Sequence, residues 1–162
     1  MTCLEAIGPV DHAMLKGIAA FCTSLNQSAT ASPANGPVAS IFLSTEGGDF
    51  YAALGIYDML RASKVPVRIV CVGPVFSAGT IILMGSDDRV AYKNTTFLIH
   101  YGSSTVESED ERRQEKRVVG DYKNLFLKHL DVRSRTVSEW LRRETYMDSR
   151  RALHCGLIKG VI

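Results

Sequence analysis

The sequence predicts one α/β domain whose sheet is largely parallel. Short apolar runs rich in Val and Ile alternate with longer segments whose apolar residues recur at helical spacing, and glycine or proline separates most of them. Strands and helices that alternate in this way form parallel sheets covered by helices. A chain of 162 residues, 46% of them hydrophobic, is long enough for one core, and we place this domain over residues 1–162.

The first half of the chain shows the alternation most clearly. Helices are expected over residues 11–25, 50–62 and 77–84, and strands over residues 38–43 and 65–72. Gly73-Pro74 is expected to end the second of these strands, because both residue types interrupt regular structure. The polar residues 26–37 are expected to form a loop.

The second half adds short strands and one long helix. Strands are expected over residues 89–92, 96–100 and 158–162, with a polar loop over 101–108, a helix over 109–130 and a short helix after Asp148. The long helix begins with charged residues, whereas Tyr122, Leu125 and Phe126 share an apolar face in its second half. A helix of this kind leaves the body of its own subunit, so we expect its apolar face to be buried against other subunits.

The composition excludes several classes of protein. A net charge of +2 is too small for a strongly basic nucleic-acid binder, and no apolar run approaches the roughly 20 residues of a membrane helix. The four cysteines form no C-x-x-C pair, so we expect no zinc knuckle. No other metal and no cofactor is expected. The N-terminal residues do not have the pattern of a signal peptide. We therefore expect a soluble, cytoplasmic protein that binds neither nucleic acid nor membranes.

Three segments carry residues that could perform chemistry. Gly47 and Gly48 follow a buried strand, where backbone N–H groups can face a ligand, although a plain tight turn explains them as well. Ser77 precedes an apolar helix and is either a nucleophile or only an N-cap. His100 ends an apolar strand, at the sheet edge where α/β sites gather, or is a structural histidine. A serine becomes a nucleophile beside a base, so Ser77 and His100 gain meaning as a pair.

Several motifs, in one order along the chain, resemble those of the Clp protease family. They are Gly8-Pro-Val-Asp-His12, Glu46-Gly-Gly48 with the helix segment Ala53-Leu-Gly-Ile-Tyr-Asp58, Val70-Cys-Val-Gly-Pro-Val-Phe-Ser-Ala-Gly79, Asn94-Thr-Thr-Phe-Leu-Ile-His100 and Arg151-Ala-Leu-His-Cys-Gly-Leu-Ile158. The resemblance runs from about residue 7 to residue 162. Motifs in register over a whole chain are specific, so the plain alternatives for Ser77 and His100 lose weight.

The resemblance implies a ClpP/crotonase-like fold of repeated β-β-α units, with residues 109–130 as a protruding handle helix. It implies a serine peptidase that works through an acyl-enzyme, with Ser77 as the nucleophile and His100 as the general base. The backbone N–H groups of Gly48 and Ala78 correspond to the oxyanion hole. The resemblance further implies a homo-oligomer of stacked rings that receives unfolded polypeptide from an ATP-dependent AAA+ unfoldase.

The chain departs from the family pattern at four places. It begins near the family's first helix, so the segment that meets the unfoldase is expected to be largely absent. Glu46 replaces a proline, and the stretch after His100 is shorter. Most important, a gapless count puts Trp140 where the family has its catalytic aspartate, and Glu139 and Glu144 are the candidates for a replacement acid.

Two other functions stay open at this point. Trp140 favours a catalytically weak or inactive ring subunit that pairs with an active paralogue, whereas the intact Ser77 and His100 favour the peptidase. A crotonase-type acyl-CoA enzyme shares the fold and the oxyanion hole, but it does not need a Ser–His pair.

Overall fold

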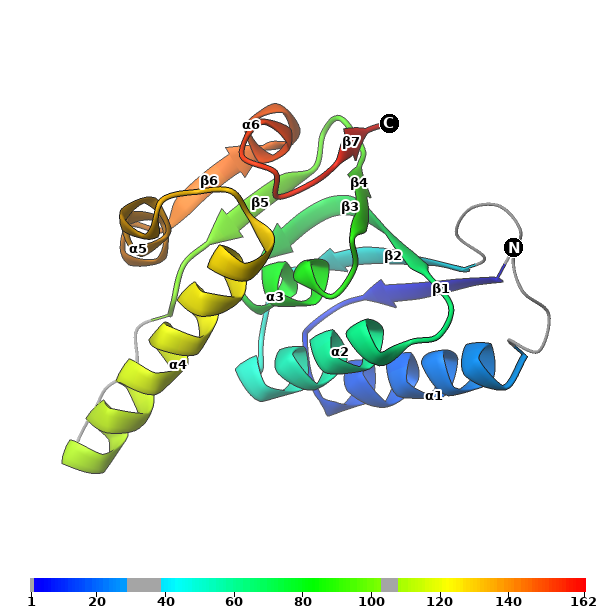
Figure 1. Cartoon of the computed structure of the whole chain (residues 1–162), viewed down its shortest axis with the longest axis horizontal. Helices are drawn as coiled ribbons and strands as arrows, with labels where there is room; N and C mark the ends of the chain where they lie inside the picture. The colour runs from blue at the N-terminus through cyan, green and yellow to red at the C-terminus, as the bar shows by residue number, and fades with distance from the viewer. Residues whose placement is uncertain (1, 29–38, 103–107) are drawn as a thin grey trace.

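The computed structural model describes residues 2–28, 39–102 and 108–162, and within them seven strands form one sheet. The strands are β1 (Thr2–Ile7), β2 (Ala39–Thr45), β3 (Val67–Phe76), β4 (Asp88–Ala91), β5 (Thr96–Ile99), β6 (Thr145–Asp148) and β7 (Gly160–Val161). Their order is β1-β2-β3-β4-β7, with β5 beside β3 and β6 beside β5 (Figure 1). Every pair is parallel except β5 with β6, which confirms the expected α/β class with a largely parallel sheet.

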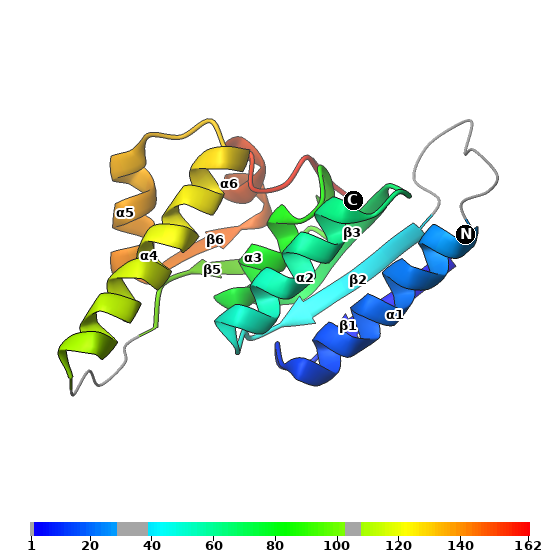
Figure 2. The same ribbon diagram turned by 60° about the horizontal axis from the view of Figure 1, so that its bottom comes forward.

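Six helices accompany the sheet in the described part of the chain. They are α1 (His12–Ser28), α2 (Phe50–Ala62), α3 (Ala78–Met84), α4 (Glu109–His129), α5 (Ser134–Arg142) and α6 (Ser149–His154). Helices α1, α2 and α3 lie side by side along one side of the sheet (Figure 2). The side chain of Asp49 begins α2 by accepting a hydrogen bond of 2.6 Å from the Ala52 N–H, which satisfies one of the free donors of the first turn.

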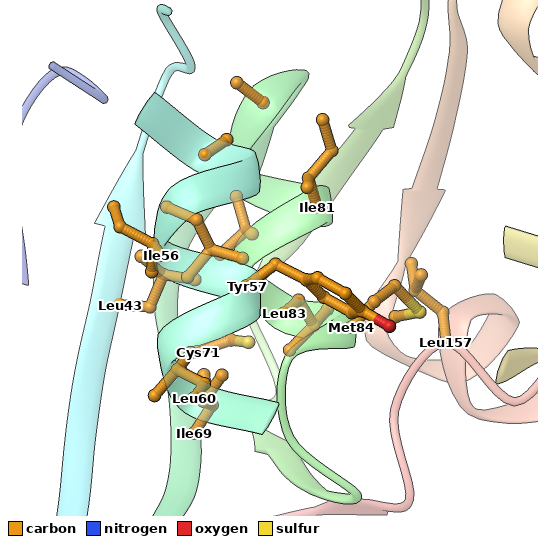
Figure 3. Packing of buried hydrophobic residues seen from close by; sticks show 14 of the residues in the cluster. Leu43, Ile56, Tyr57, Leu60, Ile69, Cys71, Ile81, Leu83, Met84 and Leu157 are labelled. Carbon is orange, nitrogen blue, oxygen red and sulfur yellow. The ribbon is translucent and has the colours of Figure 1, made fainter. Parts of the chain in front are cut away.

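The core lies between these helices and the sheet. The apolar face of α2 buries Ile56 and Leu60, and the sheet contributes Leu43 from β2 and Ile69 from β3. Every residue of α3 is buried, because this short helix packs against α2, α4 and the sheet. Figure 3 shows residues of α2, α3 and the sheet packed in one cluster. The burial of α3 fixes the residue that precedes it, Ser77, relative to the sheet.

Strand β3 changes its partner in the middle, which corrects the expectation that Gly73-Pro74 ends it. Its first part, through Cys71, pairs with β4, and its second part, from Pro74, pairs with β5. The register against β2 also shifts here, and Gly73 has a φ of +64°. A glycine supplies the unusual backbone and a proline is tolerated at such an irregularity, so the strand bends and continues to Phe76.

Two strands are not among the expected elements. β1 pairs with β2, and β6 pairs antiparallel with β5. Most of the loops that were expected over residues 26–37 and 101–108 lies outside the described residues, and α1 continues to Ser28. The other expected elements differ from the observed ones by a few residues at their ends.

Helix α4 corrects another expectation. Its first turns extend away from the sheet (Figure 1) and are exposed, and a capping box between Ser108 and Glu111 begins the helix. Its apolar face, with Tyr122, Leu125 and Phe126, is already buried within its own chain. The expectation that these three residues are buried against other subunits is therefore wrong, because α3 and α5 of the same chain contact α4.

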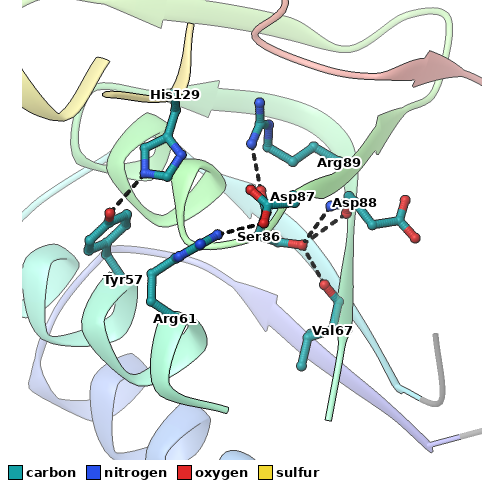
Figure 4. Close-up of polar contacts among 8 residues, drawn as sticks. All are labelled: Tyr57, Arg61, Val67, Ser86, Asp87, Asp88, Arg89 and His129. Carbon is teal, nitrogen blue, oxygen red and sulfur yellow. Dashed lines mark hydrogen bonds and ion pairs between the residues drawn. The ribbon is translucent and has the colours of Figure 1, made fainter. Parts of the chain in front are cut away.

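Polar contacts join the last turn of α4 to the body of the domain. The hydroxyl of Tyr57 in α2 lies 2.8 Å from Nε2 of His129, and Arg61 forms an ion pair of 2.9 Å with Asp87 (Figure 4). Arg89 is buried beside them, and its guanidinium donates hydrogen bonds to the carbonyl oxygens of Ser86, Gly156 and Leu157. In the described part of the chain, no helix combines the length and hydropathy needed to span a bilayer.

Candidate active site

Ser77 occupies a strained position between β3 and α3. Its φ of 52° and ψ of −121° lie where residues with a side chain are rare, and such strain is typical of functional sites. Its N–H donates a hydrogen bond of 2.8 Å to the carbonyl oxygen of Leu98 in β5. Although Ser77 stands at the N-cap position, its side chain makes no capping hydrogen bond, so its hydroxyl is not occupied by the helix that follows.

His100 directly follows β5 and its side chain is 22% exposed. The Nδ1 atom is buried and forms no hydrogen bond with any described residue. The nearest carboxylate is that of Glu144, whose Oε1 lies 3.5 Å from Nδ1. This distance is within the range of an ion pair but longer than a well-formed hydrogen bond.

The antiparallel pairing of β5 and β6 brings Glu144 to His100. Ile99 pairs with Thr145, so the register continued by one residue sets Glu144 opposite His100. Glu144 has a φ of +50°, the second non-glycine residue with a positive φ besides Ser77 among the described residues. Glu139, the other candidate acid, instead accepts a hydrogen bond of 3.1 Å from Arg135 on the exposed side of α5.

Trp140 takes no part in this polar arrangement. It lies on the buried face of α5, is 7% exposed and belongs to the hydrophobic core. The position where a gapless count expects an acid therefore holds a packing residue, and the carboxylate that approaches His100 comes from the turn after α5.

Gly47 and Gly48 lie against Ser77 and Val10. A Cβ atom on Gly47 would stand 2.8 Å from Cβ of Ser77, and one on Gly48 would stand 2.3 Å from the carbonyl oxygen of Val10. Only glycine fits this close approach. The N–H groups of Gly48 and Ala78 donate to no described residue, so both remain available to an oxyanion.

A cavity of about 490 Å³ brings the candidate residues together. Ser77, His100, Gly48 and Ala78 all line it, although Ser77 and His100 are not hydrogen-bonded to each other in the described structure. Apolar groups from Phe50, Ile81, Val118 and Tyr122 form much of the remaining wall, and polar side chains of α4, including Gln114 and Glu115, line it as well. The cavity can therefore hold an apolar group beside the serine hydroxyl.

Two hydrogen bonds connect the cavity wall to the first half of α4. The hydroxyl of Tyr101 donates a hydrogen bond of 2.7 Å to Glu115, which raises the pKa of Tyr101, because the phenol proton is held by a carboxylate. The Gln114 amide donates to the hydroxyl of Tyr51. The sequence alone does not predict these two contacts. The one feature that could have indicated them is Tyr101, which directly follows His100. In the described residues, no group of three or more His, Cys, Asp or Glu side chains is suited to a metal ion.

Comparison with known proteins finds relatives that match most of this chain. The sequence model of the family described as Clp protease matches residues 7–162. The ATP-dependent Clp protease proteolytic subunit of Deinococcus radiodurans is 32% identical over 129 residues, which are 75% of this chain and 63% of that protein. Subunit 2 of Treponema pallidum is 28% identical over 129 residues, covering 75% and 65%. The chain thus spans a little under two thirds of the length of these relatives.

Solved structures support the fold. An Asn-to-Asp mutant of ClpP1 from Listeria monocytogenes superposes with a TM-score of 0.88 and 22% identity, covering 99% of this chain and 90% of that one. Unmutated ClpP1 of the same organism gives a TM-score of 0.86 at 21% identity, with the same coverage. At this identity the likeness concerns the fold alone. Because the family match covers almost the whole sequence, the chain belongs to the Clp protease family.

Proposed function

We propose that the chain is a serine peptidase subunit of the Clp type, which cleaves peptides through an acyl-enzyme on Ser77. The observation that carries this proposal is the convergence of Ser77, His100 and the N–H groups of Gly48 and Ala78 on one cavity. This constellation, in a chain of this family, suits acyl transfer. The family match, which is to Clp proteases, favours a peptidase over an acyl-CoA enzyme.

The chemistry uses each group once in each half of the reaction. The hydroxyl oxygen of Ser77 attacks the peptide carbonyl while the imidazole of His100 takes its proton, and His100 then gives that proton to the leaving amine. Water attacks the acyl-enzyme in the same manner and frees Ser77. In both halves the N–H groups of Gly48 and Ala78 stabilise the negative oxygen of the tetrahedral intermediate.

We assign the third role, orientation of the imidazole, to Glu144. Its carboxylate lies on the Nδ1 side of His100, which leaves Nε2 for the serine hydroxyl. The side chain of Glu144 is 69% exposed, and its oxygen must move closer by several tenths of an ångström to form a good hydrogen bond. Catalytic contacts in free enzymes are often loose and tighten when substrate binds.

The relatives motivate a proposal for the substrate and the assembly. We propose unfolded polypeptide as the substrate and stacked homo-oligomeric rings as the assembly, with an AAA+ unfoldase or a paralogous subunit as partner. The relatives' description as ATP-dependent proteolytic subunits supports this proposal. Light scattering should give a mass several times 17.8 kDa, and a monomer at micromolar concentration would count against the ring.

A second candidate function is a catalytically weak or inactive ring subunit. Two observations favour it: no hydrogen bond joins Ser77 and His100 among the described residues, and Nδ1 of His100 has only the 3.5 Å contact with Glu144 and no hydrogen bond. Such a subunit would complete a ring whose active paralogue performs the cleavage.

One experiment separates the two candidates. The native chain is treated with a fluorophosphonate probe, its intact mass is measured, and the modified residue is mapped by peptide sequencing. The peptidase proposal expects one adduct on Ser77, none in Ser77→Ala and none in heat-unfolded protein. Native chain that forms particles but takes up no probe supports the inactive subunit, and an adduct that persists in Ser77→Ala overturns Ser77 as the nucleophile.

A further inference from the structure

The carbonyl oxygen of Ser77 is held by an unusual number of donors. The N–H of Thr80 donates to it at 2.9 Å, as expected for the first turn of a helix. The Thr80 hydroxyl also reaches it at 2.7 Å, and so does the hydroxyl of Tyr122 from α4, at 2.7 Å. The two hydroxyl oxygens lie 2.7 Å from each other, so the three oxygen atoms form a closed triangle.

The number of hydroxyl protons in the triangle determines which hydrogen bonds can form at one time. Thr80 and Tyr122 bring one hydroxyl proton each, while the triangle has three oxygen–oxygen contacts. Both protons cannot occupy the single contact between the hydroxyls, so at least one always points at the Ser77 carbonyl. Both residues are almost completely buried, so water does not compete for these protons. Burial also raises the pKa of Tyr122, which therefore remains a donor at any physiological pH.

The triangle and β5 hold different backbone groups of the strained residue. The N–H of Ser77 is fixed on Leu98, and its carbonyl is fixed on Thr80 and Tyr122. A residue in an unfavourable φ/ψ region keeps this conformation only if its surroundings over-determine it. Among the described residues, removal of both hydroxyls leaves the Thr80 N–H as the one donor to this carbonyl oxygen. The peptide unit after Ser77, which carries the Ala78 N–H, can then rotate.

We propose that Tyr122 and Thr80 are positioning residues, whose hydroxyls hold the backbone of Ser77 in the conformation needed for acylation. The proposal rests on the proposed function, in which Ser77 is the nucleophile and the Ala78 N–H is an oxyanion donor. Neither hydroxyl touches the reacting atoms. Tyr122 also lines the cavity and comes from α4, so it connects the position of that helix to the nucleophile.

The test removes the hydroxyls without emptying space. Tyr122→Phe keeps the ring, which packs on Phe126 at a centroid distance of 5.2 Å, and Thr80→Val keeps the shape of the threonine. Thr80→Ser restores a hydroxyl. Tyr57→Phe is the matched control, because it removes the hydroxyl of another buried tyrosine, which is bonded to His129 and does not line the cavity. The measurements are the rate constant of fluorophosphonate acylation, kcat and KM for a peptide, and the melting temperature.

We expect each single variant, Tyr122→Phe and Thr80→Val, to slow acylation about fivefold, since the other hydroxyl takes over the carbonyl. The double variant should lose more than the product of the two, about fiftyfold or more, with kcat lowered and KM nearly unchanged. Thr80→Ser, which keeps the hydroxyl that Thr80→Val removes, should be acylated at close to the native rate. Tyr57→Phe should also be acylated at the native rate, even if its melting temperature falls.

Three results would overturn the proposal. The first is a double variant that is acylated at the native rate. The second is a loss of rate in Tyr57→Phe equal to that in Tyr122→Phe, because the effect would then follow stability. The third, if the double variant does not fold, is a Thr80→Ser variant as slow as Thr80→Val. Native protein that takes up no probe removes the proposed nucleophile itself, and the positioning role falls with it, whereas the first three results leave the peptidase proposal intact.

Discussion

Glu144 stands opposite His100 where the antiparallel strands β5 and β6 end, and its Oε1 atom lies 3.5 Å from the buried Nδ1 of the imidazole. The backbone helps to place the Glu144 side chain, because Glu144 has a positive φ and directly precedes β6. The relationship therefore depends on strand register as much as on the two side chains.

Glu144→Gln should lower peptide turnover by roughly 10² to 10⁴, because an amide no longer stabilises the imidazolium that forms during acylation. Glu139→Gln is the matched control, since Glu139 bonds to Arg135 on the exposed side of α5 and should keep native turnover. Steady-state peptide hydrolysis measures both. Equal activity of the Glu144 variant and the native protein would show that Ser77 and His100 work as a dyad.

The sequence could predict the local elements but not the one that carries the acid. Helix α2 was expected over residues 50–62 and is observed there, because its apolar spacing and the capping Asp49 are local signals. Strand β6 has four residues and is defined by its pairing with β5, which is a long-range contact. Without β6, Glu144 could only be one of two candidates beside Trp140.

The same limit applies to β3 and α4. Gly73-Pro74 interrupts a strand in most sequences, whereas here the sheet offers β5 as a new partner beyond the bend. The apolar face of α4 showed that Tyr122 and Leu125 would be buried, but periodicity does not say which chain covers them. Ser77, His100 and the glycine pair could be chosen in advance because they stand at strand ends or a helix start and because the motifs around them resemble those of the Clp protease family.

Gly48→Ala should damage both fold and acylation. A methyl group there would meet the Val10 carbonyl oxygen at 2.3 Å, and the φ of +147° suits only glycine. We expect stability to fall by about 2 kcal/mol or more and probe labelling to slow at least tenfold, roughly the effect of displacing one oxyanion donor in part. Urea unfolding and acylation kinetics measure the two effects.

Gly120→Ala serves as the control for this substitution. Gly120 is inside α4 and nothing stands within 4 Å of the added methyl group, so this variant should gain up to about 1 kcal/mol and label normally. Native labelling in Gly48→Ala would argue against an oxyanion role for its N–H.

Leu125→Asp should unfold the chain itself rather than only separate subunits. Leu125 is 8% exposed within a single chain, and a carboxylate there would lose its water without gaining a partner, at a cost of about 3 kcal/mol or more. Asn124→Asp adds the same charge at the neighbouring exposed position and should leave the fold intact. Circular dichroism and light scattering distinguish the outcomes, and well-folded small particles of Leu125→Asp would contradict this prediction.

His129 should make stability depend on pH. Burial lowers the pKa of His129 below its ordinary value of 6.5, and the cations Arg61 and Arg89 lower it further. The unfolded chain then binds more protons than the folded one between the lowered pKa and 6.5, so stability is present above this window and is lost as pH falls through it. The urea concentration at the unfolding midpoint of the native protein should therefore decrease as the pH is lowered from about 7.5 to about 5.5.

The contribution of His129 is the difference between the native protein and His129→Gln, because other groups titrate in both. We expect the variant to show a smaller decrease over the same pH range. Parallel decreases in the two proteins would assign the pH dependence to other groups.

The contacts of Arg89 have a consequence for how the chain folds during its synthesis. Its buried guanidinium is satisfied by the carbonyl oxygens of Gly156 and Leu157, far later in the chain, and by that of Ser86. A nascent chain that has released Arg89 but not residue 157 has a cation on β4 and lacks most of its acceptors, which opposes closure of the core around it. The domain therefore completes its fold only after residue 157 has left the ribosome, and a product truncated before that point would expose the arginine and its apolar surroundings to proteases.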